Sequence, residues 1–351
     1  MVDISVVGAA GEVGRALATH LLRGELIGPS ERLQLVGHGR EASERKLLAE
    51  RCDLLDAFDE TAPSIQIAAT LEEVAGDIIV LAAGATISGS GADRRELAAA
   101  NRPLFEAFGS ALARAGTGQE LVIVVTNPVE LGVEILSRYV DRHRVLGMGA
   151  QQDSLRFARA IAAEMGVRRD DVHAWVCGEH GAAQVPLWSS VRIRGRDPQS
   201  IEDQVTRLRG RGRAENLAEE IKQQQVRVRD LLARESIREA FDAVEALPPD
   251  LRAALEPFVT FQCLHSTPNA TANATCEVVR ALRSGREGVV GAQVRVDGEF
   301  RDLSTTVGLP VLVHASGWTA VMCPPLTDEE ARQLDSAAAT IKTNLAHWMA
   351  D

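Results

Sequence analysis

Short apolar runs alternate with segments of helical periodicity over the first 150 residues of the chain. The runs have the length and β-branched content of buried strands: "ISVVG" (4–8), "LQLVG" (33–37), "DIIVLAAG" (77–84), "LVIVVTNP" (121–128) and "RVLGMG" (144–149). The segments "GEVGRALATHLL" and "RRELAAANRPLFEAFGSALARA" between them repeat apolar residues at helical spacing. This alternation predicts an α/β domain over residues 1–150, a doubly wound parallel sheet with helices on both faces.

The pattern changes after residue 150. The segment "QQDSLRFARAIAAEMG" predicts a helix that leads into a strand, "DVHAWVCG", and residues 194–260 are charge-rich with amphipathic helical spacing. Strand patterns return in "VVGAQVRV" (289–296) and "VGLPVLVH" (307–314), and Thr327 is the expected N-cap of a closing helix. The sequence therefore predicts a second, α+β domain over residues 151–351.

Composition and charge narrow the class of protein. Hydrophobic residues make up 45% and charged residues 25%, which is typical of folded globular proteins. A formal net charge of -11 argues against a general affinity for nucleic acid or anionic membranes. The chain has neither a signal-peptide pattern nor an apolar run of membrane-spanning length, so we expect a cytoplasmic protein. Five scattered cysteines and histidines without ligand spacing predict reduced thiols and no metal site.

A cluster of glycines, Gly8, Gly11 and Gly14, follows the first apolar run and opens the next helix. Glycines in this place let the backbone approach a pyrophosphate, whose charge is favoured at a helix N-terminus. The spacing is G-x-x-G-x-x-G, one residue longer than the usual fingerprint, and a plain tight turn is the alternative interpretation. Its position after a first strand favours dinucleotide binding.

The end of the second strand, "LQLVGHGRE", bears on which dinucleotide binds. NAD-binding domains normally place an acidic residue there to bond the ribose hydroxyls, whereas this chain has Gly37. His38, Gly39 and Arg40 follow, which leaves room for a 2′-phosphate and a guanidinium to pair with it. The sequence therefore favours NADP over NAD, unless the segment is an ordinary glycine turn with a solvent-facing arginine.

A second group of polar residues has the composition of an acid/base site. His180, in "GEHG", follows an apolar strand, and a histidine there is more often a buried or turn residue unless partners surround it. Asp153 and Arg156 lie three residues apart on the helix leading into that strand. Asn127, in "VTNP", stands at the carboxyl end of a predicted sheet strand, the edge where ligands of open α/β sheets bind.

The order and spacing of several motifs resemble the L-lactate/malate dehydrogenase family over nearly the whole chain. The motifs are "GAAGEVG", "AAGATISGSGADRRELAAAN", "VTNPVE", "QQDSLRFARAIAAEMGV", "GEHGAAQVPLWSS", "VRVDGEF" and "VGLPVLV". The resemblance implies a Rossmann domain followed by an α+β substrate domain, in a homodimer or homotetramer. It also implies that the protein is an NAD(P)-dependent oxidoreductase interconverting a 2-oxo acid and an (S)-2-hydroxy acid.

The resemblance implies a role for each residue of the acid/base group. His180 would be the general acid/base, with Asp153 holding the imidazole in the required tautomer. Arg156 would bind the substrate carboxylate through two parallel hydrogen bonds, and Asn127 would orient the reacting oxygen. Arg94 would polarise the substrate carbonyl.

Other residues are assigned by their places in the family's motifs. Arg94 lies seven residues before Asn101, as the family's mobile-loop arginine does, and Arg95 is the second candidate for its role. Ala270 and Thr271 resemble the opposite wall of the substrate pocket. The cofactor set implied is Gly8, Gly11, Glu12, Val13, Gly14, Gly37, His38, Gly39, Arg40, Ala83, Gly84, Asn101, Thr126 and Asn127.

Two departures from the family pattern bear on the substrate. Ala182 and Ala183 follow "GEHG", where the family commonly has Asp and Ser. Malate dehydrogenases carry a second arginine about six residues before the polarising one, and Ile87 or Ser88 stands there in this chain. An unpaired carboxylate is costly in a closed site, so we expect a smaller or less charged 2-oxo acid than oxaloacetate. Malate remains the alternative if an arginine from elsewhere substitutes.

Residues 226–262 are extra relative to the family's usual length, and they predict two helices around Pro248 and Pro249. The sequence leaves open whether they cap the pocket or enlarge a subunit interface. Two other functions also stay open. Cys177 beside His180 keeps a metal-dependent NAD-glycosidase in view, and the altered loop and the alanines keep a non-catalytic nucleotide-binding protein in view.

Overall fold

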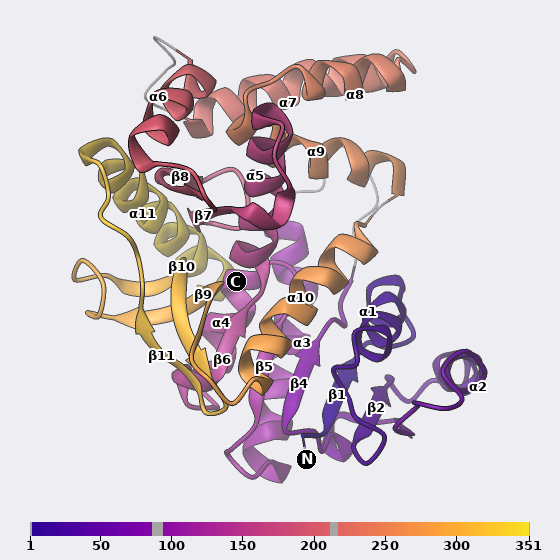
Figure 1. Ribbon diagram of the computed structural model, residues 1–351. Coiled ribbons are helices and arrows are strands. Elements are labelled where there is room, and N and C mark those ends of the chain that lie inside the picture. The colour runs from indigo at the N-terminus through magenta and orange to yellow at the C-terminus, as the bar shows by residue number, and fades with distance from the viewer. Residues whose placement is uncertain (1, 86–93, 211–216, 265, 351) are drawn as a thin grey trace.

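The computed structural model describes residues 2–85, 94–210, 217–264 and 266–350. Six parallel strands form the sheet of the first half, in the order β3-β2-β1-β4-β5-β6 (Figure 1). The strands are β1 (Ile4–Val7), β2 (Arg32–Val36), β3 (Ser64–Ala68), β4 (Ile78–Leu81), β5 (Leu121–Val124) and β6 (Val145–Gly147). The order reverses between β1 and β4, so this is a doubly wound Rossmann sheet, as the strand–helix alternation predicts.

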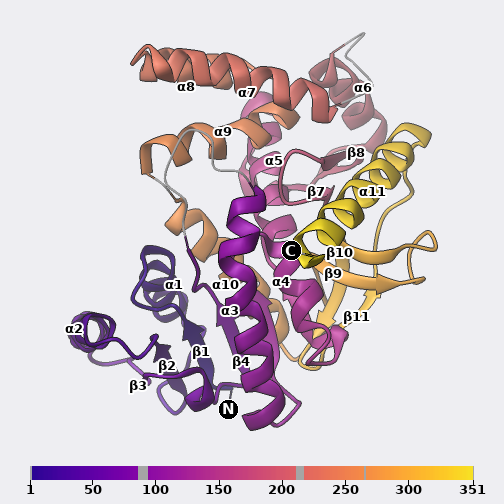
Figure 2. The ribbon, with the colours of Figure 1, turned by 180° about the vertical axis from the view of Figure 1, so that it is seen from behind.

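Helices cover both faces of this sheet. The helices α1 (Glu12–Arg23) and α10 (Pro268–Arg283) pack together on one face, and α3 (Arg94–Ala115) and α4 (Val129–Leu136) on the other (Figure 2). The helix α11 (Asp328–Ala350) packs beside α3 and α4 and covers β7, β8 and β10. The helix α2 (Glu41–Ala57) packs against β3 near the sheet edge. With both faces covered, β1, β4 and β5 are buried throughout, which is why they read as continuous apolar runs.

The second half adds antiparallel strands to the same sheet. They are β7 (Val172–Gly178), β8 (Gln184–Ile193), β9 (Gly288–Asp297), β10 (Ser304–His314) and β11 (Gly317–Val321). The strand β9 meets β6 through the pair Gly147 and Gln293, and β10 meets β7 through Gly308 and Gly178. The helix α5 (Gly149–Met165) runs from the end of β6 to β7. The α/β half is thus followed by an α+β half, as predicted.

Four helices form a layer over the end of the second half, at the top of Figure 1: α6 (Pro198–Arg209), α7 (Leu217–Ala233), α8 (Ile237–Glu245) and α9 (Pro249–Leu264). The helices α7, α8 and α9 share a core of their own that includes Ile221, Val228 and Leu255. The predicted break at the proline pair is confirmed, since α8 ends at Glu245 and α9 begins at Pro249.

The prediction of two helices over residues 226–262 is nevertheless incomplete. The helix α7 continues into this segment as far as Ala233, and a second break separates it from α8. The break lies at Glu235, whose φ of 59° places a non-glycine residue in the left-handed region. Neither glycine nor proline marks this break, so the sequence pattern carries no sign of it.

Several elements have no clear hydrophobic pattern in the sequence. The strand β3, with its alternating exposed and buried residues, the strands β8 and β11, and the helix α2 were not predicted. Three single-turn 3-10 helices, at Leu71–Glu73, Arg142–Arg144 and Arg169–Asp171, complete the described elements. None of the helices in the described part of the chain is long and apolar enough to cross a membrane.

Candidate active site

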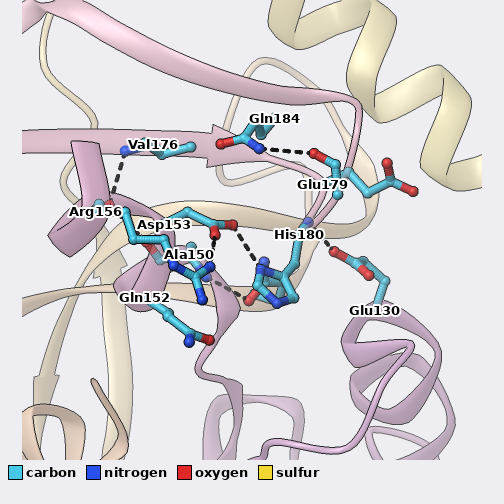
Figure 3. A network of polar contacts seen from close by, with 12 residues as sticks. Glu130, Ala150, Gln152, Asp153, Arg156, Val176, Glu179, His180 and Gln184 are labelled. Atoms are coloured by element: carbon cyan, nitrogen blue, oxygen red, sulfur yellow. Dashed lines mark hydrogen bonds and ion pairs between the residues drawn. The ribbon is translucent and has the colours of Figure 1, made fainter. Parts of the chain in front are cut away.

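The helix α5 and the end of β7 bring His180 and Asp153 together. Asp153 lies in the second turn of α5, and His180 lies two residues beyond the end of β7. The imidazole Nδ1 is 2.7 Å from Asp153 Oδ2 (Figure 3). A hydrogen on Nδ1 that is donated to this carboxylate leaves Nε2 as the nitrogen able to exchange a proton with a ligand. The predicted contact between the two residues is therefore present.

The first residue of α5 makes room for the imidazole. A Cβ at Gly149 would lie 2.5 Å from His180 Cγ and 2.9 Å from its Nδ1. Any larger residue there would displace the ring. The glycine at the start of α5 thus allows the helix to approach close enough for Asp153 to reach His180.

Asp153 is buried and remains ionised. Burial raises the pKa of its carboxyl, but His180 and the Arg156 guanidinium lower it, and the net pKa is below the usual value. The carboxylate accepts from Arg156 Nη1 at 3.1 Å through its other oxygen, Oδ1. Asp153 therefore supplies a buried negative charge beside Nδ1 of the imidazole.

Arg156 faces a cavity of about 740 Å³. Its Nη1 bonds Asp153, and its Nη2 lies 3.4 Å from Thr267 Oγ1. Burial lowers the pKa of this guanidinium, and the charge of Asp153 counteracts that effect. A guanidinium has five N–H donors, and Arg156 uses one on Asp153 and one on Thr267. Its remaining donors are available to a substrate carboxylate.

The predicted pocket wall lies beside Arg156. Ala270 is exposed and lines the same cavity, together with Gln152. Thr271 is buried, and its hydroxyl accepts from Gln152 Nε2 at 3.2 Å. Neither Gln152 nor Thr267 was singled out from the sequence, although Gln152 stands next to Asp153 and Thr267 directly precedes α10.

Arg94, at the start of α3, lies against the main chain of His180 and not against its ring. Its Nη1 donates to the His180 carbonyl oxygen at 2.8 Å, and its Nη2 donates to Glu130 Oε2 at 3.0 Å. A second carboxylate, Glu179 Oε1, lies 3.3 Å from Nη1. The predicted role of Arg94 toward a substrate carbonyl stays a prediction, and the described contacts of its guanidinium are with the protein itself. Ile87 and Ser88 lie outside the described residues.

Asn101 of α3 joins the segments that follow β4 and β5, and Thr126 and Asn127 belong to the second of these segments. Asn101 is buried and bonds the main chain on both sides, accepting from Ala85 N at 2.7 Å and donating to Asn127 O at 2.7 Å. Thr126 is also buried, and its hydroxyl donates to the carbonyls of Leu81 and Ala83. Asn101 and Thr126 therefore shape the strand ends, whereas the side chain of Asn127 is exposed at this edge.

In the glycine loop, Gly8 and Gly14 are tightly packed, whereas Gly11 has free space around it. A Cβ at Gly8, whose φ is 89°, would lie 2.5 Å from Ala83 N, and one at Gly14 would lie 2.3 Å from Gly8 O. At Gly11 the nearest atom would be Gly8 O at 3.4 Å, and Gly11 is the N-cap of α1. The loop therefore leaves its exposed backbone at the helix N-terminus, where a pyrophosphate is favoured.

Three other members of the predicted cofactor set, Glu12, Val13 and Gly84, make contacts within the protein. Glu12, in the first turn of α1, accepts from Ser266 Oγ at 2.8 Å, and Val13 packs against the main core. Gly84 is pressed against its neighbours, since a Cβ there would lie 2.6 Å from Thr126 Cγ2. These contacts give each residue a structural reason for its place.

A cavity of about 390 Å³ connects the glycine loop with the end of β2. Its lining includes Gly11, Gly37, His38, Arg40 and Lys46. A Cβ at Gly37 would lie 2.9 Å from both Ser43 Oγ and Leu47 Cδ1. Lys46, which was not among the predicted cofactor residues, reaches this cavity from α2. The cavity thus gathers cationic side chains where NAD-binding domains have an acid.

Ser43 also lines this cavity, and its hydroxyl has no hydrogen-bond partner although it is buried. A buried hydroxyl without a partner is costly, so it marks a place for a polar ligand atom. The chemistry of the lining therefore fits the ribose and phosphate of a dinucleotide.

A further cavity of about 840 Å³ lies between β8, α6 and α11, and its lining contains none of the candidate residues. Cys177 is buried and hydrogen-bonds Cys323, and this contact together with burial raises the pKa of its thiol. A thiol held in its neutral form is a poor metal ligand. Among the described residues no group of three His, Cys, Asp or Glu side chains is arranged to hold a metal.

Known protein families and individual proteins are similar to most of this chain. The family described as lactate/malate dehydrogenase, NAD binding domain, matches residues 2–147, and the lactate/malate dehydrogenase alpha/beta C-terminal domain matches residues 151–228. The malate dehydrogenase of Haloferax volcanii is 28% identical and covers 97% of this chain and 98% of its own. The L-2-hydroxycarboxylate dehydrogenase (NAD(P)(+)) of Methanocaldococcus jannaschii is 26% identical, covering 97% and 96%.

Solved structures show the same fold. The malate dehydrogenase of Plasmodium falciparum superposes with a TM-score of 0.77 at 18% identity over 99% of each chain. A lactate dehydrogenase from a deep-sea metagenome library also gives 0.77 at 18% identity, over 99% of each chain. The two family matches together span more than half of the chain, in the order that the motifs predict. The chain belongs to the lactate/malate dehydrogenase family.

Proposed function

We propose that this protein is an NADP-preferring oxidoreductase that interconverts a 2-oxo acid and an (S)-2-hydroxy acid. The observation that carries the proposal is the 2.7 Å contact between His180 Nδ1 and Asp153 Oδ2 beside the Arg156 guanidinium. A proton donor backed by a carboxylate, next to a carboxylate-binding group, suits reduction of a carbonyl alpha to a carboxylate. We assign the cofactor to residues 1–150 and the substrate mainly to residues 151–351.

The proposed mechanism divides the chemistry between the bound nucleotide and the chain. The nicotinamide ring supplies hydride to the carbonyl carbon when the cofactor is bound. His180 donates a proton from Nε2 to the carbonyl oxygen and removes it in the reverse direction, while Asp153 stabilises the imidazolium. Arg156 binds the substrate carboxylate, and the exposed amide of Asn127 orients the reacting oxygen.

A direct role for Arg94 on the substrate would require it to exchange partners. The Glu130 side chain is 1% exposed and the Glu179 side chain 6% exposed, and both contact this guanidinium. Moving Arg94 away would leave two buried carboxylates without their cation, which is costly. The arrangement therefore favours a supporting role for Arg94.

The preference for NADP rests on the cavity beside β2. Arg40 and Lys46 supply two cations, and Ser43 supplies the unpartnered hydroxyl. Replacing Arg40 and Lys46 together by serine is expected to lower kcat/KM for NADPH at least about tenfold while changing that for NADH little, since hydrogen bonds to charged groups are worth about 1.5–3 kcal/mol. Arg45→Ser is the matched control, because Arg45 lies in the same helix but pairs with Glu41. Equal losses for both nucleotides would contradict the preference.

Malate is the second candidate substrate, and a specific observation favours it. Two further arginines, Arg159 and Arg169, line the cavity into which Arg156 faces. Arg159 pairs with Glu256, and Arg169 donates to the carbonyl of Val172. Either could receive a distal carboxylate by exchanging partners. Several curated relatives are named malate dehydrogenase, which adds to this candidate.

A substrate panel tests both candidates. Absorbance at the reduced nicotinamide band is followed with pyruvate, longer 2-oxo acids and oxaloacetate, each with NADPH and NADH. Activity with uncharged side groups and NADPH is expected. Preference for oxaloacetate, lost in Arg159→Gln, would establish malate instead, and silence with all substrates from folded protein would end the proposal.

We also propose a homodimer or homotetramer in the cytoplasm. All five cysteines are unpaired, as expected in a reducing compartment. Light scattering coupled to size exclusion measures the subunit count, and a monomer at working concentration would contradict the first part.

A further inference from the structure

Both main-chain polar groups of His180 are held by side chains. Its N–H donates to Glu130 Oε1 at 2.6 Å, and its carbonyl oxygen accepts from Arg94 Nη1 at 2.8 Å. Arg94 Nη2 donates to Glu130 Oε2 at 3.0 Å, which closes a ring of three hydrogen bonds. Figure 3 shows Glu130 and Asp153 on opposite sides of His180. We call this ring of Glu130, Arg94 and the His180 main chain the peptide clamp.

The glycine after His180 provides the space that the peptide clamp needs. A Cβ at Gly181 would lie 1.9 Å from Arg94 Nη1 and 2.9 Å from Glu179 Oε2. Arg94 is held at this place by its bonds to Glu130 and His180 and by its ion pair with Glu179. A methyl group at Gly181 would therefore push the guanidinium out while leaving every charge of the group in place.

The turn that carries His180 needs such support. His180 lies between the end of β7 at Gly178 and the start of β8 at Gln184, outside the paired region of either strand. A side chain on an unpaired turn keeps its direction only if its Cα is held by other contacts. Small misplacements of a reacting group are costly, on the order of 10²-fold in rate for about 1 Å.

We propose that Glu130 is a positioning residue for the reaction, which acts through the peptide clamp to keep the His180 imidazole on Asp153. The inference rests on the proposed role of His180 as the acid/base. Glu130 lies in α4, which begins directly after Asn127 and Pro128. The peptide clamp therefore also ties His180 to the strand end that carries Asn127, so that the two groups proposed to contact the substrate oxygen are held relative to each other.

The experiment compares Glu130→Gln and Gly181→Ala with a matched control, Glu134→Gln. Glu134 lies one turn further along α4 and is also buried, accepting from Arg295 Nε at 3.1 Å and from Thr306 Oγ1 at 2.8 Å. It makes no contact with His180 that the structure records. Glu130→Gln and Gly181→Ala are expected to lower kcat about 10- to 100-fold with the KM for nucleotide within about threefold. Glu134→Gln is expected to lose thermal stability with kcat nearly unchanged.

A second readout does not depend on turnover. Long-range 1H–15N spectra of the protein labelled at histidine report the tautomer of each ring, and His180→Asn identifies the His180 signals. The wild-type spectrum is expected to show hydrogen held on Nδ1, and Glu130→Gln and Gly181→Ala are expected to shift these signals toward a mixture of tautomers. Glu134→Gln is expected to leave them unchanged.

The outcomes separate this inference from the proposed function. If no 2-oxo acid is turned over, the proposed function fails and the spectra alone decide the peptide clamp. Unchanged His180 signals in both test variants would overturn the inference, and so would equal effects of Glu130→Gln and Glu134→Gln. Should Glu130→Gln fail to fold, Gly181→Ala carries the test, because it leaves both carboxylates in place.

Discussion

The chemistry of His180 depends on which of its ring nitrogens carries hydrogen. Asp153 decides this by accepting at Nδ1, and the turn after β7 directs the ring toward α5. The backbone of the same residue is held from the other side by Glu130 and Arg94. At this scale, one carboxylate contacts the imidazole ring, and a second carboxylate and a guanidinium hold the main chain of the same residue.

Replacing His180 by Asn tests the acid/base role. Asparagine keeps a polar group near Asp153 but cannot gain or lose a proton, so kcat is expected to fall about 10²- to 10⁴-fold. The dissociation constant for NADPH, measured by fluorescence titration, is expected to change little, because His180 does not line the nucleotide cavity. His347→Asn, at an exposed position of α11, is the control. Retained turnover would refute the role.

Arg156→Lys tests carboxylate binding. Lysine keeps the charge but cannot present two parallel donors, so the KM for the 2-oxo acid is expected to rise roughly tenfold or more, given about 1.5–3 kcal/mol for hydrogen bonds to charged groups. Arg168→Lys is the control, since that guanidinium pairs with Asp170 at the surface. An unchanged KM in steady-state kinetics would show that Arg156 does not bind the substrate.

At the scale of elements, the closing helix was predicted from its N-terminal signal. Thr327 Oγ1 accepts from Glu330 N at 3.2 Å, and Glu330 Oε2 accepts from Thr327 N at 2.9 Å, which together form a capping box. Glu330 also accepts from Ser189, so the cap of α11 is joined to β8. Glu330 of the capping box therefore also contacts a strand that is distant in the sequence.

Thr327→Ala is expected to destabilise the protein by about 1 kcal/mol, because it removes the acceptor for one helix N–H. Urea unfolding followed by circular dichroism measures the change. Thr343→Ala, at an exposed position inside the same helix, is expected to cost nothing or to stabilise slightly. Equal effects of the two substitutions would show that the cap is not what Thr327 contributes.

At the scale of the whole molecule, few ladder pairs join the two halves of the sheet. Gly147 and Gln293 pair β6 with β9, and side chains add further contacts across the same boundary. Arg142, just before β6, pairs with Glu299, in the turn after β9. This pair lowers the pKa of Glu299 to about 2, chiefly through the hydrogen bond from Arg142.

The lowered pKa of Glu299 makes the stability of the fold depend on pH in a defined direction. A folded-state pKa below the ordinary glutamate value of 4.5 means that the pair stabilises the fold above about pH 4.5 and that this contribution is lost as the pH falls toward 2. Glu299→Gln is therefore expected to lower the free energy of unfolding at pH 6 and to reduce its dependence on pH below 4.5. Glu287→Gln, an exposed position before β9, is the control for urea unfolding across this range. An unchanged acid limb would contradict the prediction.

Several elements of this fold are predictable because their signals lie in neighbouring residues. Apolar runs of β1, β4 and β5, the glycine loop before α1 and the cap of α11 each require only neighbouring residues, so periodicity and turn chemistry reveal them. The order of the motifs was sufficient to identify the family. The same motifs contain His180, Asp153 and Arg156.

The surroundings of His180, Asp153 and Arg156 depend on contacts between distant parts of the chain. Glu130 and Lys46 were not predicted because each resembles an ordinary charged residue of a helix. Glu130 contacts His180, 50 residues further along the chain, and Lys46 lines the cavity beside β2. Neither the strand β3 nor the break at Glu235 has a local marker in the sequence, and β3 forms by pairing with β2, about 30 residues earlier in the chain. Arg94 shows the same limit, since its place in the sequence suits a substrate contact and its buried partners hold it at the His180 main chain.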